Sequence, residues 1–269
     1  MAQKSVSYYP SFWQAVNLIV LYTFLQSVID FPLALYDYQH GTDWLQEPLL
    51  KLPVFFGTTA IILFLGTRFS GLSYREIYPM KVSRWLVYPV ILFTLIPLRF
   101  FMDDISMHVE KLLPPPSWFM ELFNRLFESD YGIWVGILRV VVLAPVVEEL
   151  IFRGVIFSGF QRIYPAFWAI FLSALLFALF HLNPWQLGPT FLLGLLLGYI
   201  RLRTGSLLVA IFTHALHNGL IFLSVYWSQW DLNQGWMQPG RLTGYLISTL
   251  WLASGTTLLF YLTKKKKAS

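Results

Sequence analysis

Eight apolar runs, separated by shorter polar connections, follow one another along this sequence. A helix that crosses a membrane needs about 20 consecutive, mainly apolar residues, and most of these runs approach that length. The pattern therefore predicts an all-α fold, a polytopic transmembrane helical bundle of about eight spans. The predicted spans are roughly Phe12–Leu35, Leu52–Thr67, Trp85–Met102, Ile133–Phe160, Pro165–His181, Trp185–Ile200, Ser206–Tyr226 and Leu242–Leu262.

The longest polar stretch covers residues 103–131, and three prolines, Pro114–Pro116, interrupt it. Ser117 can cap a short amphipathic helix over Trp118–Phe127, expected to lie on the membrane surface as a connector or a lid. A second short interfacial helix is expected within Leu72–Tyr78. No repeat or linker divides the chain, so we predict a single membrane domain over residues 1–269.

The composition supports an integral, multi-pass membrane location. The chain is 57% hydrophobic and 12% charged, whereas soluble domains carry about 25% charge. The net charge of +5 does not indicate nucleic-acid binding, because much of it lies at Lys264–Lys267 and at span ends. The absence of cysteine excludes disulfides, thiolate metal sites and a cysteine nucleophile. The first apolar run lacks a small-residue cleavage site, so we interpret it as a retained span.

The charges of the connections predict an orientation. Basic residues follow spans two, four, six and eight, and acidic residues follow spans one and three. Cytoplasmic connections are enriched in lysine and arginine. Both termini are therefore expected to be cytoplasmic, although Arg139, inside the fourth span, does not fit a simple charge count.

The fourth span carries three ionisable side chains within roughly 28 largely apolar residues. Each costs about 2.5–3.5 kcal/mol at a bilayer centre on insertion scales. Glu149 and Arg153 are four residues apart, so they can form an ion pair on one helix face. Glu148 lies about 100° further round the helix and has no local partner. The three side chains form either a polar lock between helices or a functional site, and the unpartnered Glu148 favours the site.

Polar groups also occur in two other spans. His181 ends the fifth span, and His214, His217 and Asn218 lie inside the seventh, with His214 and Asn218 on one face. A lone histidine in a span is more often a helix–helix hydrogen bond than a catalytic group. Contributions from three spans, however, suggest that Glu148, His181, His214 and Asn218 converge on one buried cavity. A carboxylate and an imidazole can deprotonate a water molecule, and an imidazole and an amide can stabilise an oxyanion.

These residues carry a resemblance to a known family. In order, Glu148-Glu149-x-x-x-Arg153, Phe177-x-x-x-His181 and His214-x-x-x-Asn218 resemble the three motifs of the CPBP family. That family, formerly called Abi, contains the CAAX proteases and bacteriocin-processing enzymes, among them the Ras-converting CAAX prenyl endopeptidase. The motif-bearing core covers about residues 130–225.

The resemblance implies an intramembrane endopeptidase of the CAAX type that hydrolyses a peptide bond of a membrane-associated or prenylated substrate. By resemblance, Glu148 is the base that activates water, His181 positions the water, and His214 and Asn218 stabilise the oxyanion. Glu149, Arg153 and Phe177 fall at supporting positions. The substrate is expected to reach the site from the bilayer or from the cytoplasmic side.

Three alternatives remain open. Glu148, His181 and His214 could form a His2Glu zinc set, but a metal-free mechanism, without any cofactor, is favoured because it gives Asn218 a role. The chain could also be a non-catalytic membrane scaffold or a bacteriocin-immunity protein that keeps the polar cluster for packing. A proton-coupled carrier ranks last, since the sequence has no internal repeat of the transporter kind.

Overall fold

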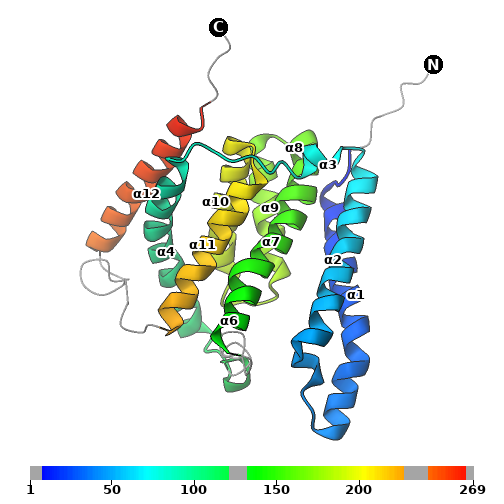
Figure 1. The fold of residues 1–269 in the computed structure, drawn as a ribbon. Coiled ribbons are helices and arrows are strands. Elements are labelled where there is room, and N and C mark those ends of the chain that lie inside the picture. The colour runs from blue at the N-terminus through cyan, green and yellow to red at the C-terminus, as the bar shows by residue number, and fades with distance from the viewer. Residues whose placement is uncertain (1–7, 121–131, 227–241, 265–269) are drawn as a thin grey trace, which may run out of the picture.

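The computed structural model of the chain describes residues 8–120, 132–226 and 242–264. These residues are helical without any strand, which confirms the predicted all-α class. A helix occupies each of the eight predicted spans (Figure 1). The long helices are α1 (Phe12–His40), α2 (Pro48–Ser70), α4 (Val87–Leu112), α9 (Ala166–Phe180), α10 (Leu187–Thr204), α11 (Leu207–Tyr226) and α12 (Leu242–Leu262). The fourth span is one continuous helix built from α6 (Ile133–Gly136), η2 (Ile137–Leu143), α7 (Ala144–Glu149), η3 (Leu150–Ile156) and α8 (Phe157–Ile163).

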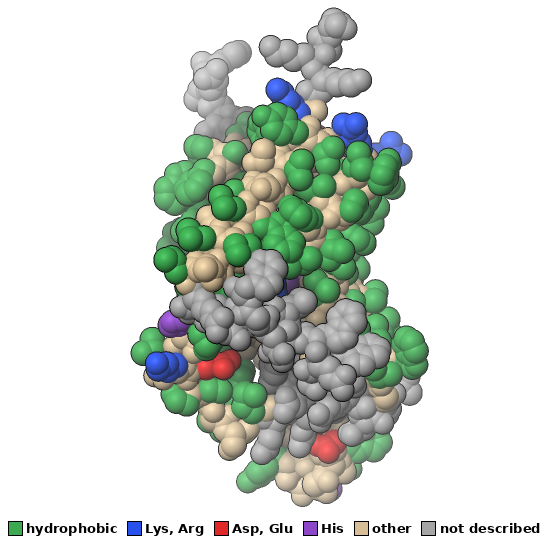
Figure 2. Space-filling model, turned by 90° about the vertical axis from the view of Figure 1, so that its left-hand side faces the viewer, with side chains coloured by type: hydrophobic (Ala, Val, Ile, Leu, Met, Phe, Trp, Pro, Cys, Tyr) green, Lys and Arg blue, Asp and Glu red, His purple; other side chains and the backbone are tan. Residues whose placement is uncertain are grey.

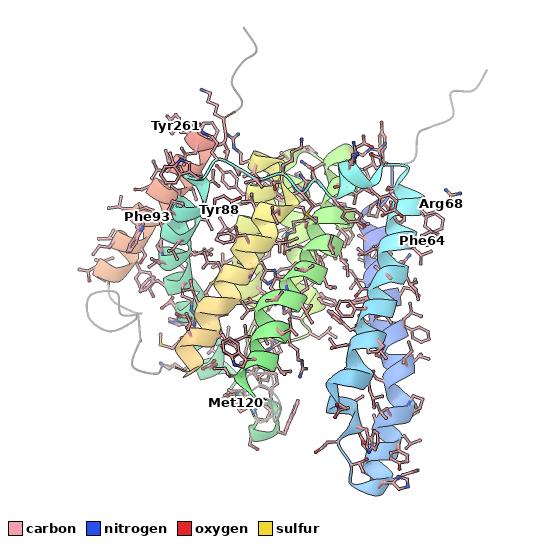
Figure 3. All side chains as sticks on the ribbon, viewed as in Figure 1. Phe64, Arg68, Tyr88, Phe93, Met120 and Tyr261 are labelled. Carbon is pink, nitrogen blue, oxygen red and sulfur yellow. The ribbon has the colours of Figure 1, made fainter. Side chains whose placement is uncertain are left out.

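The chain is a polytopic helical bundle. By length and apolar composition, four of the described helices can cross a membrane: Phe12–His40, Leu50–Ser70, Leu207–Ser224 and Leu242–Leu262. Ala166–Phe180 is also apolar but shorter, at 15 residues. The outer surface suits lipid contact, because large apolar side chains such as Phe64 and Tyr261, which are 59% and 64% exposed, point away from the helices (Figure 3).

The helices are arranged in three groups (Figure 1). The antiparallel pair α1 and α2 stands at one side, and α4 packs against α12 at the other. Between them lie the fourth-span helix, α9, α10 and α11. On the face drawn in Figure 2, Lys and Arg side chains gather at the upper end and also appear at the lower left, apolar side chains cover the middle, and Asp and Glu appear only in the lower half.

The central helices α9 and α10 approach each other closely at two glycines. A Cβ atom added to Gly194 would lie 2.9 Å from the Cα of Ala174, and one added to Gly198 would lie 3.2 Å from the side chain of Ile170. The small-residue face predicted for the sixth span therefore forms a helix–helix contact, as is common in membranes.

Three segments outside the predicted spans can be compared with the sequence prediction. The helix of the third span runs ten residues beyond Met102, to Leu112, because no helix breaker lies between Met102 and Pro114 and because Asp103 pairs with Arg99 one turn earlier. The expected interfacial helix is present as α3 (Tyr74–Ile77), closed by a capping box between Ser73 and Glu76. Of the amphipathic helix expected over Trp118–Phe127, residues 118–120 are helical, and the remainder lies outside the described residues.

Candidate active site

The two adjacent glutamates lie in α7, between the π-helical segments η2 and η3. In a π turn a backbone N–H bonds to the carbonyl five residues earlier, an uncommon arrangement that recurs at functional sites. At the end of η2, the N–H of Ala144 bonds to the carbonyl of Arg139. The next bond in this register would require an N–H on Pro145, which proline lacks. The carbonyl of Val140 is therefore left without a backbone donor in this register.

Asn218 of α11 supplies the missing donor. Its Nδ2 donates a hydrogen bond to the carbonyl oxygen of Val140 at 2.8 Å. This bond fastens α11 to the helix that carries Glu148. Because an amide nitrogen carries two hydrogens, the contact uses one donor of Asn218 and leaves the second for a ligand.

Glu149 and Arg153 form the predicted ion pair, and both side chains are 0% exposed. Nη1 of Arg153 donates to Oε1 of Glu149 at 2.9 Å, and Nη2 donates to the carbonyl of Gly194 at 3.0 Å. The guanidinium carbon also lies 4.5 Å from the centre of the Phe177 ring. Arg153 therefore joins the fourth-span helix to α9 and α10.

His214 is oriented by the same carboxylate. Its Nδ1 lies 3.0 Å from Oε1 of Glu149. A carboxylate paired with Arg153 is ionised and accepts hydrogen bonds, so Nδ1 carries the hydrogen. The other ring nitrogen, Nε2, then faces Oε2 of Glu148 at 3.8 Å.

His181 is held in an equivalent way at the end of α9. Its Nδ1 donates to the carbonyl of Phe177 at 2.9 Å, because a carbonyl oxygen can only accept. Its Nε2 lies 4.0 Å from Oε2 of Glu148. The ring of Phe177 packs edge-on against both imidazoles, with centroids 4.9 Å from His181 and 5.5 Å from His214. Phe177 thus supports both histidines.

Three side chains from three helices therefore converge on one point. Oε2 of Glu148 makes no hydrogen bond within the described part of the chain, and the Nε2 atoms of His181 and His214 both face it. The separations are too long for direct hydrogen bonds but allow one small group to contact all three atoms. The arrangement can hold a water molecule between a carboxylate and two imidazoles.

This point lies in the wall of a cavity of about 630 Å³ between α1, α2 and the central helices. Glu148, His181, His214 and Asn218 all line it, as the sequence predicted for a shared cavity, and His217 lines it as well. The side chains of Glu148 and His181 are 18% and 22% exposed, so a molecule in the cavity can reach them. The far end of the cavity is lined by Asp30 of α1 and Lys51 of α2, which form an ion pair.

Comparison with known proteins agrees with this geometry. Residues 130–220 match the model of a protein family described as "Type II CAAX prenyl endopeptidase Rce1-like". This segment is therefore similar to a CAAX prenyl endopeptidase domain. It contains the three motifs, which confirms the resemblance to the CPBP family.

Among curated proteins, the chain is similar to the "Uncharacterized 24.3 kDa protein" of Escherichia coli, with 34% identity over 119 residues. The match takes in 41% of this chain and 53% of that protein, so the chain spans about half the length of the relative. No solved structure matches the chain.

The site contains the nitrogen and oxygen donors that zinc uses, with Glu149 and the carbonyl of Phe177 bonded to the far nitrogens of the two histidines. In a tetrahedral zinc site, donor atoms about 2.0–2.2 Å from the metal lie ~3.3 Å from one another. The separations of 3.8 and 4.0 Å are longer, and no group of three or more His, Cys, Asp or Glu in the described ranges is placed to hold a metal ion. We therefore derive no catalytic step through a metal.

Several features of the site were not predicted from the sequence. Glu149 was expected only to pair with Arg153, but it also orients His214. The bond from Asn218 to Val140 and the two π-helical segments were missed, although Pro145 after an apolar run is a signal for a displaced backbone carbonyl. The helices α1 and α2 also line the cavity, but no motif in their sequences predicts this.

Proposed function

We propose that the chain is an intramembrane endopeptidase that hydrolyses a peptide bond with a water molecule activated by Glu148. The observation that carries this proposal is the convergence of His181 and His214 on the unbonded Oε2 of Glu148, inside a cavity of a CAAX protease domain. Glu148 and His181 hold the water, and Glu148 accepts a proton as the water oxygen attacks the carbonyl carbon of the scissile bond.

Attack produces a tetrahedral intermediate with a negatively charged oxygen. His214 can donate to this oxyanion only when Nε2 carries a hydrogen, since Nδ1 already donates to Glu149. The second hydrogen of the Asn218 amide is the other donor. Collapse of the intermediate breaks the C–N bond, and the proton held by Glu148 passes to the leaving amine.

The substrate class follows from the cavity. Its walls are largely apolar and include Val54, Phe55, Leu138 and Ile221, which suits a membrane-associated peptide or a lipid-modified chain end. The cavity reaches from Glu148 toward Asp30 and Lys51, near the end where α1 joins α2. If both termini are cytoplasmic, this end faces away from the cytoplasm. Substrate would then arrive from the bilayer, one of the two routes expected from the sequence, or from the non-cytoplasmic side.

Proteomics of protein termini tests the proposal in cells. We expect new chain termini in cells that express the wild-type protein, and none in cells with Glu148→Gln at equal abundance. Glu110→Gln changes an exposed glutamate at the end of α4 and serves as the matched control. If Glu148→Gln preserves both the termini and the cellular phenotype, the chain is a scaffold and the proposal is wrong.

A further inference from the structure

A second hollow lies on the outer surface of the bundle, apart from the candidate active site. This groove has a volume of about 360 Å³ and runs between α10 and α12, which both pack against α4. It is lined by Tyr199 of α10 and by Thr256, Thr257, Phe260 and Tyr261 of α12. Because Phe260 and Tyr261 are exposed on a surface that suits lipid contact, lipid is the ligand closest at hand for this groove.

Two side chains of α10 hold α12 beside the groove. The hydroxyl of Tyr199 donates to the carbonyl of Thr256 at 3.4 Å. One turn later, Arg203 donates from Nη2 to the carbonyl of Phe260 at 2.8 Å and from Nε to the hydroxyl of Thr263 at 3.3 Å. These bonds fix the guanidinium at the end of the groove where α12 stops. The hydrogens on Nη1 have no hydrogen-bond partner in the described part of the chain.

This end of the groove carries positive charge that no acidic side chain neutralises. Lys264 is exposed and follows Tyr261 by one turn. Neither Lys264 nor Arg203 forms an ion pair with an Asp or Glu among residues 8–120, 132–226 and 242–264. Figure 2 looks onto the side where α12 lies and shows Lys and Arg gathered at its upper end, with apolar side chains below. The end of the groove therefore favours an anionic group.

The exposed side of α12 repeats the order of groups in a phospholipid. Leu246, Leu250, Thr257 and Tyr261 lie within about 60° of one another around the helix. Apolar side chains thus come first, hydroxyl groups follow, and the cations stand at the end. From Leu250 to Tyr261 the helix rises about 16 Å, close to the ~15 Å hydrocarbon thickness of one leaflet. Acyl chains beside the leucines would therefore place a phosphate at the cations.

The two cations select the kind of headgroup. A guanidinium and an ammonium group both bind phosphate oxygens, and basic side chains at a membrane surface attract anionic lipids. A choline headgroup would bring a further cation to the same place, whereas a glycerol headgroup brings none. We propose that the groove between α10 and α12 binds one anionic phospholipid, with its phosphate between Arg203 and Lys264. The bound lipid fastens α12 to α10, and it is independent of the proposed hydrolysis.

The test counts bound lipid. Phosphatidylglycerol and phosphatidylcholine with identical acyl chains are titrated separately into the purified full-length protein in a neutral detergent, and the complexes are measured by native mass spectrometry. A basic residue near a membrane surface contributes about fivefold in affinity, so two cations give a preference for one phosphatidylglycerol of about 5- to 30-fold. Lys264→Gln should weaken its binding about fivefold.

Two further variants separate a built site from general attraction to positive charge. Thr257→Trp places a large side chain in the groove and leaves every charge in place, so it should remove the bound lipid. Arg68→Gln removes one charge from an exposed residue on the opposite side of the same end of the molecule (Figure 3), and it should bind lipid as the wild-type protein does. Arg203 is left unchanged, because it also holds α12.

Four results would overturn the proposal. The first is equal binding of the two lipids by the wild-type protein. The second is a loss of affinity in Arg68→Gln as large as that in Lys264→Gln, which would show attraction to overall charge. The third is wild-type binding of phosphatidylglycerol by Thr257→Trp. The fourth is displacement of the lipid by an equal concentration of inorganic phosphate, which would assign the cations to a free phosphate.

Discussion

Replacement of Arg153 by alanine should destabilise the protein severely. Both partners of the Arg153–Glu149 pair are fully buried, so the substitution leaves a carboxylate without its cation. It also removes the hydrogen bond to Gly194 and the contact with the Phe177 ring. Breaking a buried pair by removing one partner costs about 3–5 kcal/mol. After the substitution, the carboxylate of Glu149 keeps only the hydrogen bond from His214 to Oε1, because Oε2 has no hydrogen-bond partner within the described residues.

The assay is unfolding in detergent micelles, followed by the intrinsic fluorescence of the 11 tryptophans. Arg153→Ala should show a low folded yield and a lowered unfolding midpoint. The double variant Arg153→Met/Glu149→Gln removes both charges and should recover stability, because no charge is left buried alone. Its activity should nevertheless fall, since the glutamine amide presents a neutral oxygen to His214 in place of the carboxylate. A wild-type midpoint for Arg153→Ala would refute the reasoning.

Three further predictions concern metal, orientation and the oxyanion. Active protein should contain no stoichiometric zinc and should retain activity in strong chelators; one zinc per chain, with activity lost on chelation and restored by metal, would contradict this. A single cysteine at Asp43 should react with an impermeant thiol reagent in intact cells and one at Arg75 should not; the reverse pattern would invert the topology. Asn218→Ala should lower kcat about 10²–10³-fold with little change in KM, whereas His217→Ala should matter less than His214→Ala. A pure KM effect of Asn218→Ala, measured on a peptide in defined lipid, would remove Asn218 from the oxyanion site.

The sequence predicted the helices well because apolar runs of membrane length are a strong and local signal. The places of the eight spans, the close contact at Gly194 and the pair between Glu149 and Arg153 all follow from spacing along single helices. The sequence did not predict the extension of α4 to Leu112, because the apolar run ends at Met102, directly before Asp103 and Asp104.

The site was predictable only in part, for a physical reason. Motif spacing identified Glu148, His181 and His214, but it does not say which ring nitrogen faces which oxygen. That depends on contacts between helices, such as the one from His214 to Glu149, 65 positions apart. The π-helical segment η2 also changes which residues share a helix face. A prediction that assumes 100° per residue therefore misplaces Arg139, which lines the cavity.

Turnover of a cleavable peptide by purified protein in defined lipid tests the central claim most directly. Glu148→Gln keeps the size of the side chain but cannot accept the proton from water. Because general-base catalysis contributes about 10²–10⁴-fold, we expect turnover to fall by at least that factor, with the unfolding midpoint unchanged and Glu110→Gln fully active. Turnover by Glu148→Gln within a few-fold of wild type would contradict the account.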